Sequence, residues 1–287
     1  MANGGAQQFD TQDIPFRTIG DRQLLGRLYR PRRAGPCPAV VDVHGGAWTK
    51  NDRLQNRAID EALAASGIVV FAIDFRMPPE VRYPVTVADV NYGIRWFKRH
   101  AAQYGSAERL VGVLGSSSGG QLAMLNALRP THPDYCTEAP ELGGVDASVA
   151  FATVLWPVID PLARYRMVQA RGDQGILSAH HAFFADEAAM AEGNPQMVLD
   201  RGEAERLPPA LLIQGTADDN LTPDMPKRFA ESYAKAGGRL SLHMFKDQPH
   251  TFISRAPDSA DAKAAIGLVA SFVHEECAAF ERDGERR

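Results

Sequence analysis

The sequence predicts an α/β protein with a mostly parallel central sheet, flanking helices and a helical cap inserted late in the chain. Apolar, β-branched runs alternate with segments of helical spacing, and this alternation implies right-handed crossovers between parallel strands. The alternation lapses between residues 160 and 206, in a stretch too long for an ordinary connection and too helical for a linker. We therefore expect one domain over residues 1–287, with the cap at about 160–206.

The first half of the chain opens with a hairpin signal. Two strand-like segments, Ile14 to Ile19 and Leu24 to Tyr29, flank the turn residues Gly20 and Asp21. Further along, the pattern predicts strands in PAVVDVHGG, IVVFAID and RLVGVLG, and helices in NRAIDEALAASG and TVADVNYGIRWFKRHAAQYG.

The second half continues the same alternation on both sides of the cap. A helix from Gln121 to Leu128 is followed by a strand in DASVAFATVLWPV. After the cap, the pattern predicts strands in PALLIQG and RLSLHMF, and helices from Pro226 to Ala236 and from Ala260 to Phe280.

Composition excludes several classes of protein. The chain is 45% hydrophobic and 23% charged, with a formal net charge of -4, and it has no basic block interleaved with aromatics that would favour nucleic acid. No apolar run reaches the roughly 18 residues of a membrane span, and no secretory leader pattern is visible. Cys37, Cys136 and Cys277 fit neither a disulfide framework nor a zinc pattern. We expect a cytoplasmic protein; the sequence leaves open whether it forms a homo-oligomer.

Three consecutive serines stand where a buried strand ends and a helix begins. Gly115 and Gly119 place Ser117 at the centre of a G-x-S-x-G motif, whose required context is strand, sharp turn and helix. Glycines at both ends let the strand and helix approach closely, while the central residue takes strained dihedrals. We expect Ser117 to be a nucleophile.

A serine nucleophile needs a base and an orienting acid, in the chain order serine, acid, histidine on this type of fold. His250 follows the strand near the C-terminus, and two acids, Asp218 and Asp219, follow the strand in PALLIQG. Both loops lie at the carboxyl ends of parallel strands, where open α/β sheets place their sites. The residues alone do not decide between Asp218 and Asp219.

Acyl transfer also needs hydrogen-bond donors aimed at the oxygen that becomes negative. The run VDVHGGAW places glycines directly after a central strand, where backbone N–H groups can point into a site. We expect the oxyanion hole to use the N–H groups of Gly45, Gly46 and Ser118.

These motifs together resemble the α/β-hydrolase superfamily, and more narrowly its hormone-sensitive-lipase-like and feruloyl-esterase-like bacterial esterases. The resemblance runs from about Pro38 to the C-terminal helix and rests on VDVHGGAW, FAIDFRMPPEVRYPVTVADV, GSSSGGQLA, LLIQGTADDNLTP and PHTF. It implies that Asp218 is the acid, because the acid of such proteins stands three residues after a glycine.

Two positions depart from the family pattern, Ala47 for a third glycine and Ser118 for an alanine, but both keep the backbone N–H. The acid loop also resembles that of prolyl-oligopeptidase-type peptidases, but these carry a large extra domain that we do not expect in a chain of 287 residues.

The predicted function is hydrolysis of carboxylic esters of small or medium acyl groups by Ser117, His250 and Asp218. Cleavage of an amide, such as an aryl formamide or a short peptide, is a second candidate, and a non-catalytic binding protein of the same fold is a third. We expect no metal or organic cofactor, since adjacent His180 and His181 would diverge by about 100° on a helix and lack supporting ligands.

Four aromatic residues are candidates for the walls of the substrate pocket. They are Trp48, Trp156, Phe183 and Phe184. Aromatics at such spacing also serve as ordinary core residues, and the sequence does not decide between the two roles.

Overall fold

The computed structural model describes residues 8–284, and its chain enters the sheet through an antiparallel hairpin. Strands β1 (Phe9–Ile19) and β2 (Arg22–Pro31) pair along nearly their whole length, with Gly20 in the turn at a φ of 57°. The predicted hairpin is confirmed, and its strands are longer than the apolar pattern indicates because backbone pairing continues into the polar ends.

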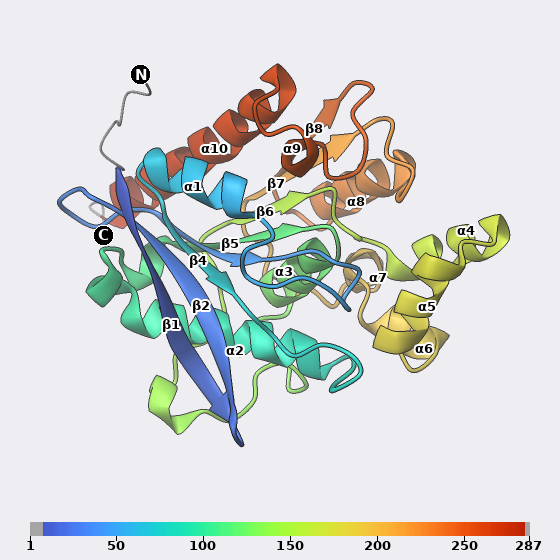
Figure 1. Cartoon of the computed structure of the whole chain (residues 1–287), viewed down its shortest axis with the longest axis horizontal. Coiled ribbons are helices and arrows are strands. Elements are labelled where there is room, and N and C mark those ends of the chain that lie inside the picture. The colour runs from blue at the N-terminus through green and yellow to red at the C-terminus, as the bar shows by residue number, and fades with distance from the viewer. Residues whose placement is uncertain (1–7, 285–287) are drawn as a thin grey trace, which may run out of the picture.

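Eight strands form one sheet within the described residues, in the order β1-β2-β4-β3-β5-β6-β7-β8 (Figure 1). The hairpin joins β4 in antiparallel fashion, and every pair from β4 to β8 is parallel. The remaining strands are β3 (Ala39–Val43), β4 (Val69–Ile73), β5 (Val111–Ser116), β6 (Ala152–Leu155), β7 (Ala210–Gly215) and β8 (Leu240–Phe245). This is the α/β-hydrolase arrangement, as the sequence predicted.

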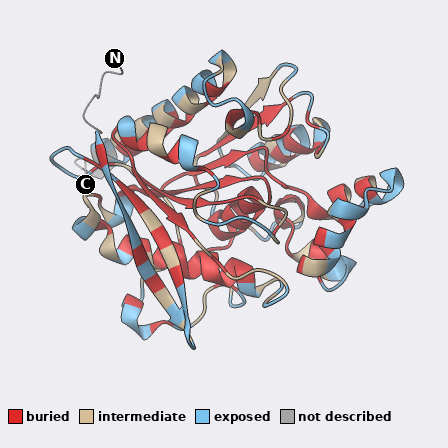
Figure 2. Cartoon of the chain, in the orientation of Figure 1, coloured by how far each residue is buried: buried red, intermediate tan, exposed pale blue. Residues whose placement is uncertain are grey.

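Helices cover both faces of this sheet and create two cores. Val41 and Phe71 pack on the face covered by α2, α3 and α8, whereas Val40 and Val70 pack on the face covered by α1 and α10. The alternation explains why the central strands are apolar throughout, since both of their faces are buried (Figure 2). The helices outside the cap are α1 (Arg57–Ala65), α2 (Val85–His100), α3 (Ser118–Leu128), α8 (Asp224–Lys235), α9 (Phe252–Arg255) and α10 (Ala260–Gly284), with short 3₁₀ turns η1 (Ala101–Tyr104), η2 (Glu108–Leu110) and η3 (Pro140–Leu142).

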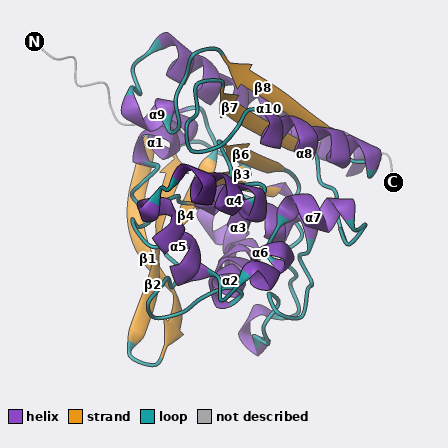
Figure 3. Ribbon diagram, turned by 90° about the vertical axis from the view of Figure 1, so that its right-hand side faces the viewer, coloured by secondary structure: helices purple, strands orange, loops and turns teal. Residues whose placement is uncertain are grey.

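Four short helices occupy the segment between β6 and β7, where the sequence predicts a cap. They are α4 (Pro161–Arg171), α5 (Gln174–Phe183), α6 (Glu187–Glu192) and α7 (Pro195–Asp200). Helices α4, α5 and α6 project beyond one side of the sheet, and Figure 3 views the molecule from that side. Aspartate or asparagine side chains cap all four N-termini, which explains why so polar a stretch is helical.

Several element boundaries differ from the sequence prediction, and those of α3 and β6 lie near the serine turn and the cap. Helix α3 begins at Ser118, directly after the serine turn, instead of Gln121. Strand β6 covers only Ala152–Leu155 of the longer apolar run, because the residues before it follow the η3 turn and those after it leave the sheet toward the cap. No helix formed by residues 8–284 combines the length and apolar character that crossing a membrane requires.

Candidate active site

Ser117 lies in a tight turn between β5 and α3. Its φ is 51°, a value that side-chain-bearing residues rarely adopt, and its N–H donates to the Leu155 carbonyl at 2.9 Å. A side chain at Gly119 would place its Cβ 2.1 Å from the Val43 carbonyl oxygen, so α3 approaches β3 this closely only because the residue is glycine. The packing therefore holds Ser117 in a strained conformation at the N-terminus of a helix.

The structure brings together the three residues that the sequence predicts as nucleophile, base and acid. Ser117 Oγ lies 2.9 Å from His250 Nε2, and His250 Nδ1 lies 2.8 Å from Asp218 Oδ2. Both His250 and Ser117 are 7% exposed, so bulk water has little access to this chain of hydrogen bonds. An ionised carboxylate can only accept, which places the imidazole proton on Nδ1 and leaves Nε2 to accept from the serine hydroxyl.

Asp218 is held ionised by a dense set of donors. Its Oδ1 accepts from the N–H groups of Asn220 and Leu221 at 2.8 and 3.0 Å, and its Oδ2 also accepts from Gln214 Nε2 at 2.7 Å. Burial alone would raise the pKa of Asp218, but the hydrogen bond and charge of His250, with the donors from Gln214 and Asn220, hold that pKa below its ordinary value. The neighbouring Asp219 is exposed and makes no such contact.

The N–H groups that the sequence predicts as oxyanion donors lie in the loop after β3 and at the start of α3, and one of them is already bonded within the protein. The Gly45 N–H donates to Ser116 Oγ at 3.1 Å, so this donor is already engaged inside the protein. In residues 8–284, the N–H groups of Gly46, Ala47 and Ser118 have no acceptor. Gly46 has a φ of 126°, and a Cβ there would lie 2.2 Å from the Lys50 carbonyl oxygen, so glycine is required for the loop to turn.

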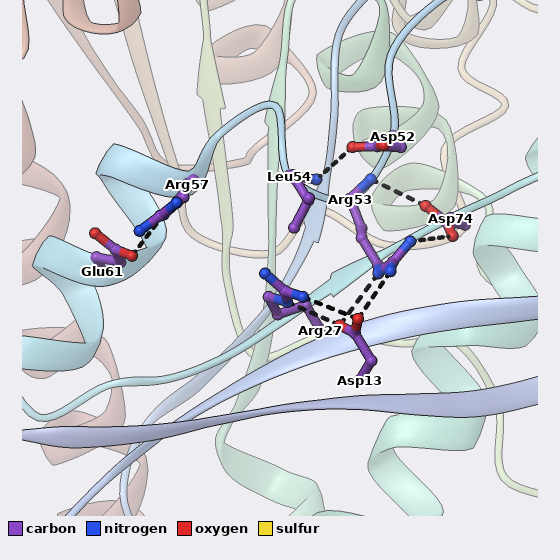
Figure 4. A network of polar contacts seen from close by, with 8 residues as sticks. All are labelled: Asp13, Arg27, Asp52, Arg53, Leu54, Arg57, Glu61 and Asp74. Carbon is purple, nitrogen blue, oxygen red and sulfur yellow. Dashed lines mark hydrogen bonds and ion pairs between the residues drawn. The ribbon is translucent and has the colours of Figure 1, made fainter.

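An arginine anchors the far end of this loop to two strands of the sheet (Figure 4). Arg53 bonds both oxygens of Asp13 on β1, and its Nη1 lies 2.9 Å from Asp74 Oδ2, just after β4. The Arg53 N–H also donates to Asp74, and the Arg53 side chain is only 15% exposed. The loop that carries Gly46 and Ala47 is therefore fixed at its end by half-buried ion pairs.

A cavity of about 230 Å³ opens over Ser117 and His250. Of the four predicted pocket aromatics, Trp156 lines this cavity. The other three form a buried cluster beside it: Trp48 stacks on Phe183 with ring centroids 5.0 Å apart, and Phe184 meets Trp48 edge to face. All three are at most 1% exposed, and they join the cap to the loop after β3.

His180 and His181 have separate structural partners. His180 is fully buried against Trp48, and burial together with the charge of Arg164 lowers the pKa of His180 to about 3, so it is neutral. His181 Nε2 lies 3.1 Å from the Tyr165 hydroxyl.

Three residues near the site have no signal in the sequence. Gln214 is the penultimate residue of a buried strand, Asn220 follows Asp218 in a polar loop, and Arg164 is one of several arginines in the cap. Their proximity to the serine and histidine arises from folding of segments far apart in the chain, so no local motif indicates it.

Comparison with known proteins finds esterases that are similar to this chain over most of its length. Among curated proteins, Esterase LipC of Mycobacterium tuberculosis is 29% identical over 204 residues, which cover 68% of this chain and 48% of that protein. Carboxylic ester hydrolase LipN of the same organism is 34% identical over 242 residues, covering 81% of this chain and 61% of LipN. The chain thus spans about half the length of LipC.

Solved structures show the same fold. An esterase from Thermogutta terrifontis with propionate bound superimposes with a TM-score of 0.74 at 26% identity, covering 92% of this chain and 94% of that one. The carboxylesterase EstE1 from a metagenomic library gives a TM-score of 0.77 at 22% identity, covering 93% and 89%, and shows the fold alone.

A family model bears directly on classification. The model described as BD-FAE matches residues 27–233, which include the loop after β3, the serine turn, the segment between β6 and β7, and Asp218. The chain belongs to the BD-FAE family, within the α/β-hydrolase superfamily.

Proposed function

We propose that this protein is a carboxylic ester hydrolase in which Ser117, His250 and Asp218 form a catalytic triad. One observation carries the proposal: a continuous chain of hydrogen bonds leads from Asp218 Oδ2 through both nitrogens of His250 to Ser117 Oγ, which faces a cavity. Each group has the chemistry that its position requires, namely an ionised acid, a base with Nε2 as acceptor and an unionised hydroxyl.

The reaction proceeds in two steps. His250 Nε2 takes the proton of Ser117 as Oγ attacks the ester carbonyl, and the imidazolium that forms is stabilised by Asp218. The same proton then passes from Nε2 to the leaving alkoxide, which departs as the alcohol and leaves an acyl group on Oγ. Water, activated by His250, attacks the acyl-enzyme and releases the acid.

The tetrahedral intermediate needs donors for its oxyanion, and we assign these to Gly46, Ala47 and Ser118. This assignment replaces Gly45, which the sequence suggested, because the Gly45 N–H is bonded to Ser116 Oγ. The N–H of Ser118 belongs to the first turn of α3, so the positive end of the helix adds to its effect. Loss of one such donor would raise the barrier by roughly 3–4 kcal/mol.

The relatives support ester hydrolysis of a small acyl group. LipC and LipN are named as an esterase and a carboxylic ester hydrolase, and the Thermogutta esterase is described with propionate bound. A cavity of about 230 Å³ fits an acyl group of that size better than a long chain.

The test is hydrolysis of para-nitrophenyl esters from acetate to decanoate by the wild type and by Ser117→Ala. We expect turnover in the wild type, fastest for the short esters, and its loss in the variant. Ser178→Ala, which removes an exposed serine from α5, is the matched control and should keep full turnover. Undiminished turnover by a folded Ser117→Ala would overturn the assignment, and a folded wild type inactive on every ester would favour an amide substrate.

A further inference from the structure

Arg164, on the first cap helix α4, is an unusual wall residue of the cavity. Its side chain is among the largest that are fully buried, with 1% exposure, and it lines the same cavity as Ser117 and His250. In the described part of the chain, no carboxylate forms an ion pair with it. Burying a cation without an ionic partner is costly, so this arrangement calls for an explanation.

The bonds that Arg164 makes use little of its capacity to donate. It donates to the Asn220 side-chain oxygen, but its Nε is 3.4 Å from the Asn220 carbonyl and its Nη1 is 3.5 Å from His180 Nε2. By contrast, the buried Arg95 donates to two carbonyl oxygens at 2.7 and 2.8 Å. A guanidinium has five N–H donors, and Arg164 makes one short hydrogen bond.

Arg164 nevertheless remains charged. Burial lowers its pKa to about 10, which is still far above neutral pH. The charge of Asp218 partly offsets this burial, but both Asp218 oxygens are occupied by His250, Gln214 and backbone donors, so that carboxylate is not available to pair with the guanidinium.

The rest of the cavity wall has the same character. Lys50 also lines the cavity and has no ion pair to any described residue. Among the described residues that line the cavity there is no aspartate or glutamate, and several are neutral hydrogen-bonding residues: Asn51, Gln55, Asn220, Thr251 and Ser254. The wall therefore carries cationic and polar side chains, and no carboxylate of the described lining residues neutralises them.

We propose that Arg164, assisted by Lys50, binds an anionic group of the substrate, so that the enzyme acts on esters that carry a carboxylate a few bonds from the scissile carbonyl. The substrate carboxylate would form the ion pair with Arg164 that no described carboxylate of the protein forms. The planar guanidinium can donate two parallel hydrogen bonds to the two oxygens of such a carboxylate. This inference rests on the proposed ester hydrolysis and names its substrate class. The carboxylate can belong to the acyl part or to the alcohol part.

Two pairs of esters distinguish these cases. Monoethyl glutarate and its monoamide analogue differ only in a carboxylate on the acyl side, whereas O-acetylglycolate and O-acetylglycolamide differ only in a carboxylate on the alcohol side. We expect the wild type to give at least a tenfold higher kcat/KM for the anionic member of one pair, chiefly through a lower KM. Equal or better hydrolysis of the neutral member in both pairs would overturn the proposal.

Variants connect the preference to the residue. Arg164→Gln should lower the ratio of anionic to neutral kcat/KM at least tenfold, and Arg164→Lys should lose less of it because the charge remains. Lys50→Gln, at an exposed position that folding tolerates, should reduce the ratio severalfold. Arg166→Gln is the matched control, since this exposed arginine lies on the same helix and pairs with Glu187. If Arg164→Gln slows both members equally, the residue only holds the Asn220 loop and the proposal fails.

A binding measurement separates failure of this inference from failure of the proposed function. Calorimetry with Ser117→Ala should show tighter binding of glutarate or glycolate, the hydrolysis products that keep the tested carboxylate, than of the corresponding amides, and Arg164→Gln should abolish the difference. This readout requires no turnover. Para-nitrophenyl acetate hydrolysis that depends on Ser117, combined with no preference for anions in either assay, would leave the esterase proposal standing and overturn the anionic substrate.

Discussion

Gln214 donates a 2.7 Å hydrogen bond to Oδ2 of Asp218, the same oxygen that lies 2.8 Å from His250 Nδ1. Strand β7 thus supplies a second donor to the carboxylate oxygen that His250 contacts. Gln214 is fully buried and does not line the cavity, so it acts on the site only through Asp218.

Replacement of Gln214 should therefore change the pH profile as well as the rate. In Gln214→Met, the pKa of Asp218 rises because a donor to its ionised form is gone, so activity is lost at a higher pH on the acidic side. We expect kcat to fall about tenfold with little change in KM. The profile of kcat against pH is the measurement.

A buried glutamine elsewhere provides the control for this result. Gln196 is also fully buried and bonds the side chains of Asp200 and Ser232, away from the site. Gln196→Met should lower the free energy of unfolding without moving the acidic limb of activity. An unshifted limb in Gln214→Met would mean that the glutamine has a structural role only.

Two arginines of one loop region should differ sharply in their contribution to stability. Arg53→Ala leaves the half-buried Asp13 and Asp74 without a shared cation, and we expect a loss of about 1–3 kcal/mol in the free energy of unfolding and slower ester turnover. Arg57→Ala removes only an exposed pair with Glu61, which contributes less than about 0.5 kcal/mol. Urea unfolding of both variants is the measurement, and equal effects would contradict the anchoring role of Arg53.

Gly119 should tolerate no side chain at all. In Gly119→Ala the new Cβ would lie 2.1 and 2.3 Å from the carbonyl oxygens of Val43 and His44. Relief of these clashes would require the backbone after β3 to shift, which costs free energy. We expect little folded protein and no activity. Gly175→Ala in α5 meets nothing nearer than 3.5 Å and should stabilise the protein by up to about 1 kcal/mol. Circular dichroism melts compare the two, and a Gly119→Ala variant that melts like the wild type would refute this account of the turn.

Two buried carboxyl groups, Asp42 and Asp60, should make stability fall as pH rises. Burial raises the pKa of Asp42 to about 7 and the pKa of Asp60 well above its ordinary value, with the charge of Asp42 adding to the effect on Asp60. Above the unfolded pKa of about 4, the folded state then binds more protons than the unfolded state, so the free energy of unfolding decreases with increasing pH. One such group contributes a slope of at most about 1.4 kcal/mol per pH unit.

Asp60→Asn should flatten this decline. Neither carboxyl oxygen of Asp60 has a hydrogen-bond partner in the described residues, so an amide loses no contact there. In urea unfolding at pH 5, 7 and 9, the free energy of unfolding of the variant, relative to that of the wild type, should increase as pH rises. Asp219→Asn, at an exposed position, is the control, and its free energy of unfolding should depend on pH as that of the wild type does. Parallel behaviour of Asp60→Asn would mean that Asp60 titrates normally.

The sequence by itself determined the order of strands and helices, the hairpin and the residues now found in the serine turn and its partner loops. Such features are local: apolar periodicity reports which faces are buried, and glycines around Ser117 report a turn that side chains would obstruct. The chain order of Ser117, Asp218 and His250 at strand ends then predicted that the three residues meet, and they do.

Only the tertiary structure decided what each of these groups faces. The sequence predicts Gly45 as an oxyanion donor, but in the fold its N–H donates to Ser116 at the end of the neighbouring strand β5. The sequence allows Trp48 and Phe183 to be either pocket or core residues, and the structure shows their rings stacked and buried where the cap helix α5 meets the loop after β3. Arg164 becomes notable only when folding buries it beside Ser117 without a carboxylate partner. The physical reason is common to all of them: engagement of a donor, burial of a ring and isolation of a charge depend on contacts between distant segments, and no local pattern records those contacts.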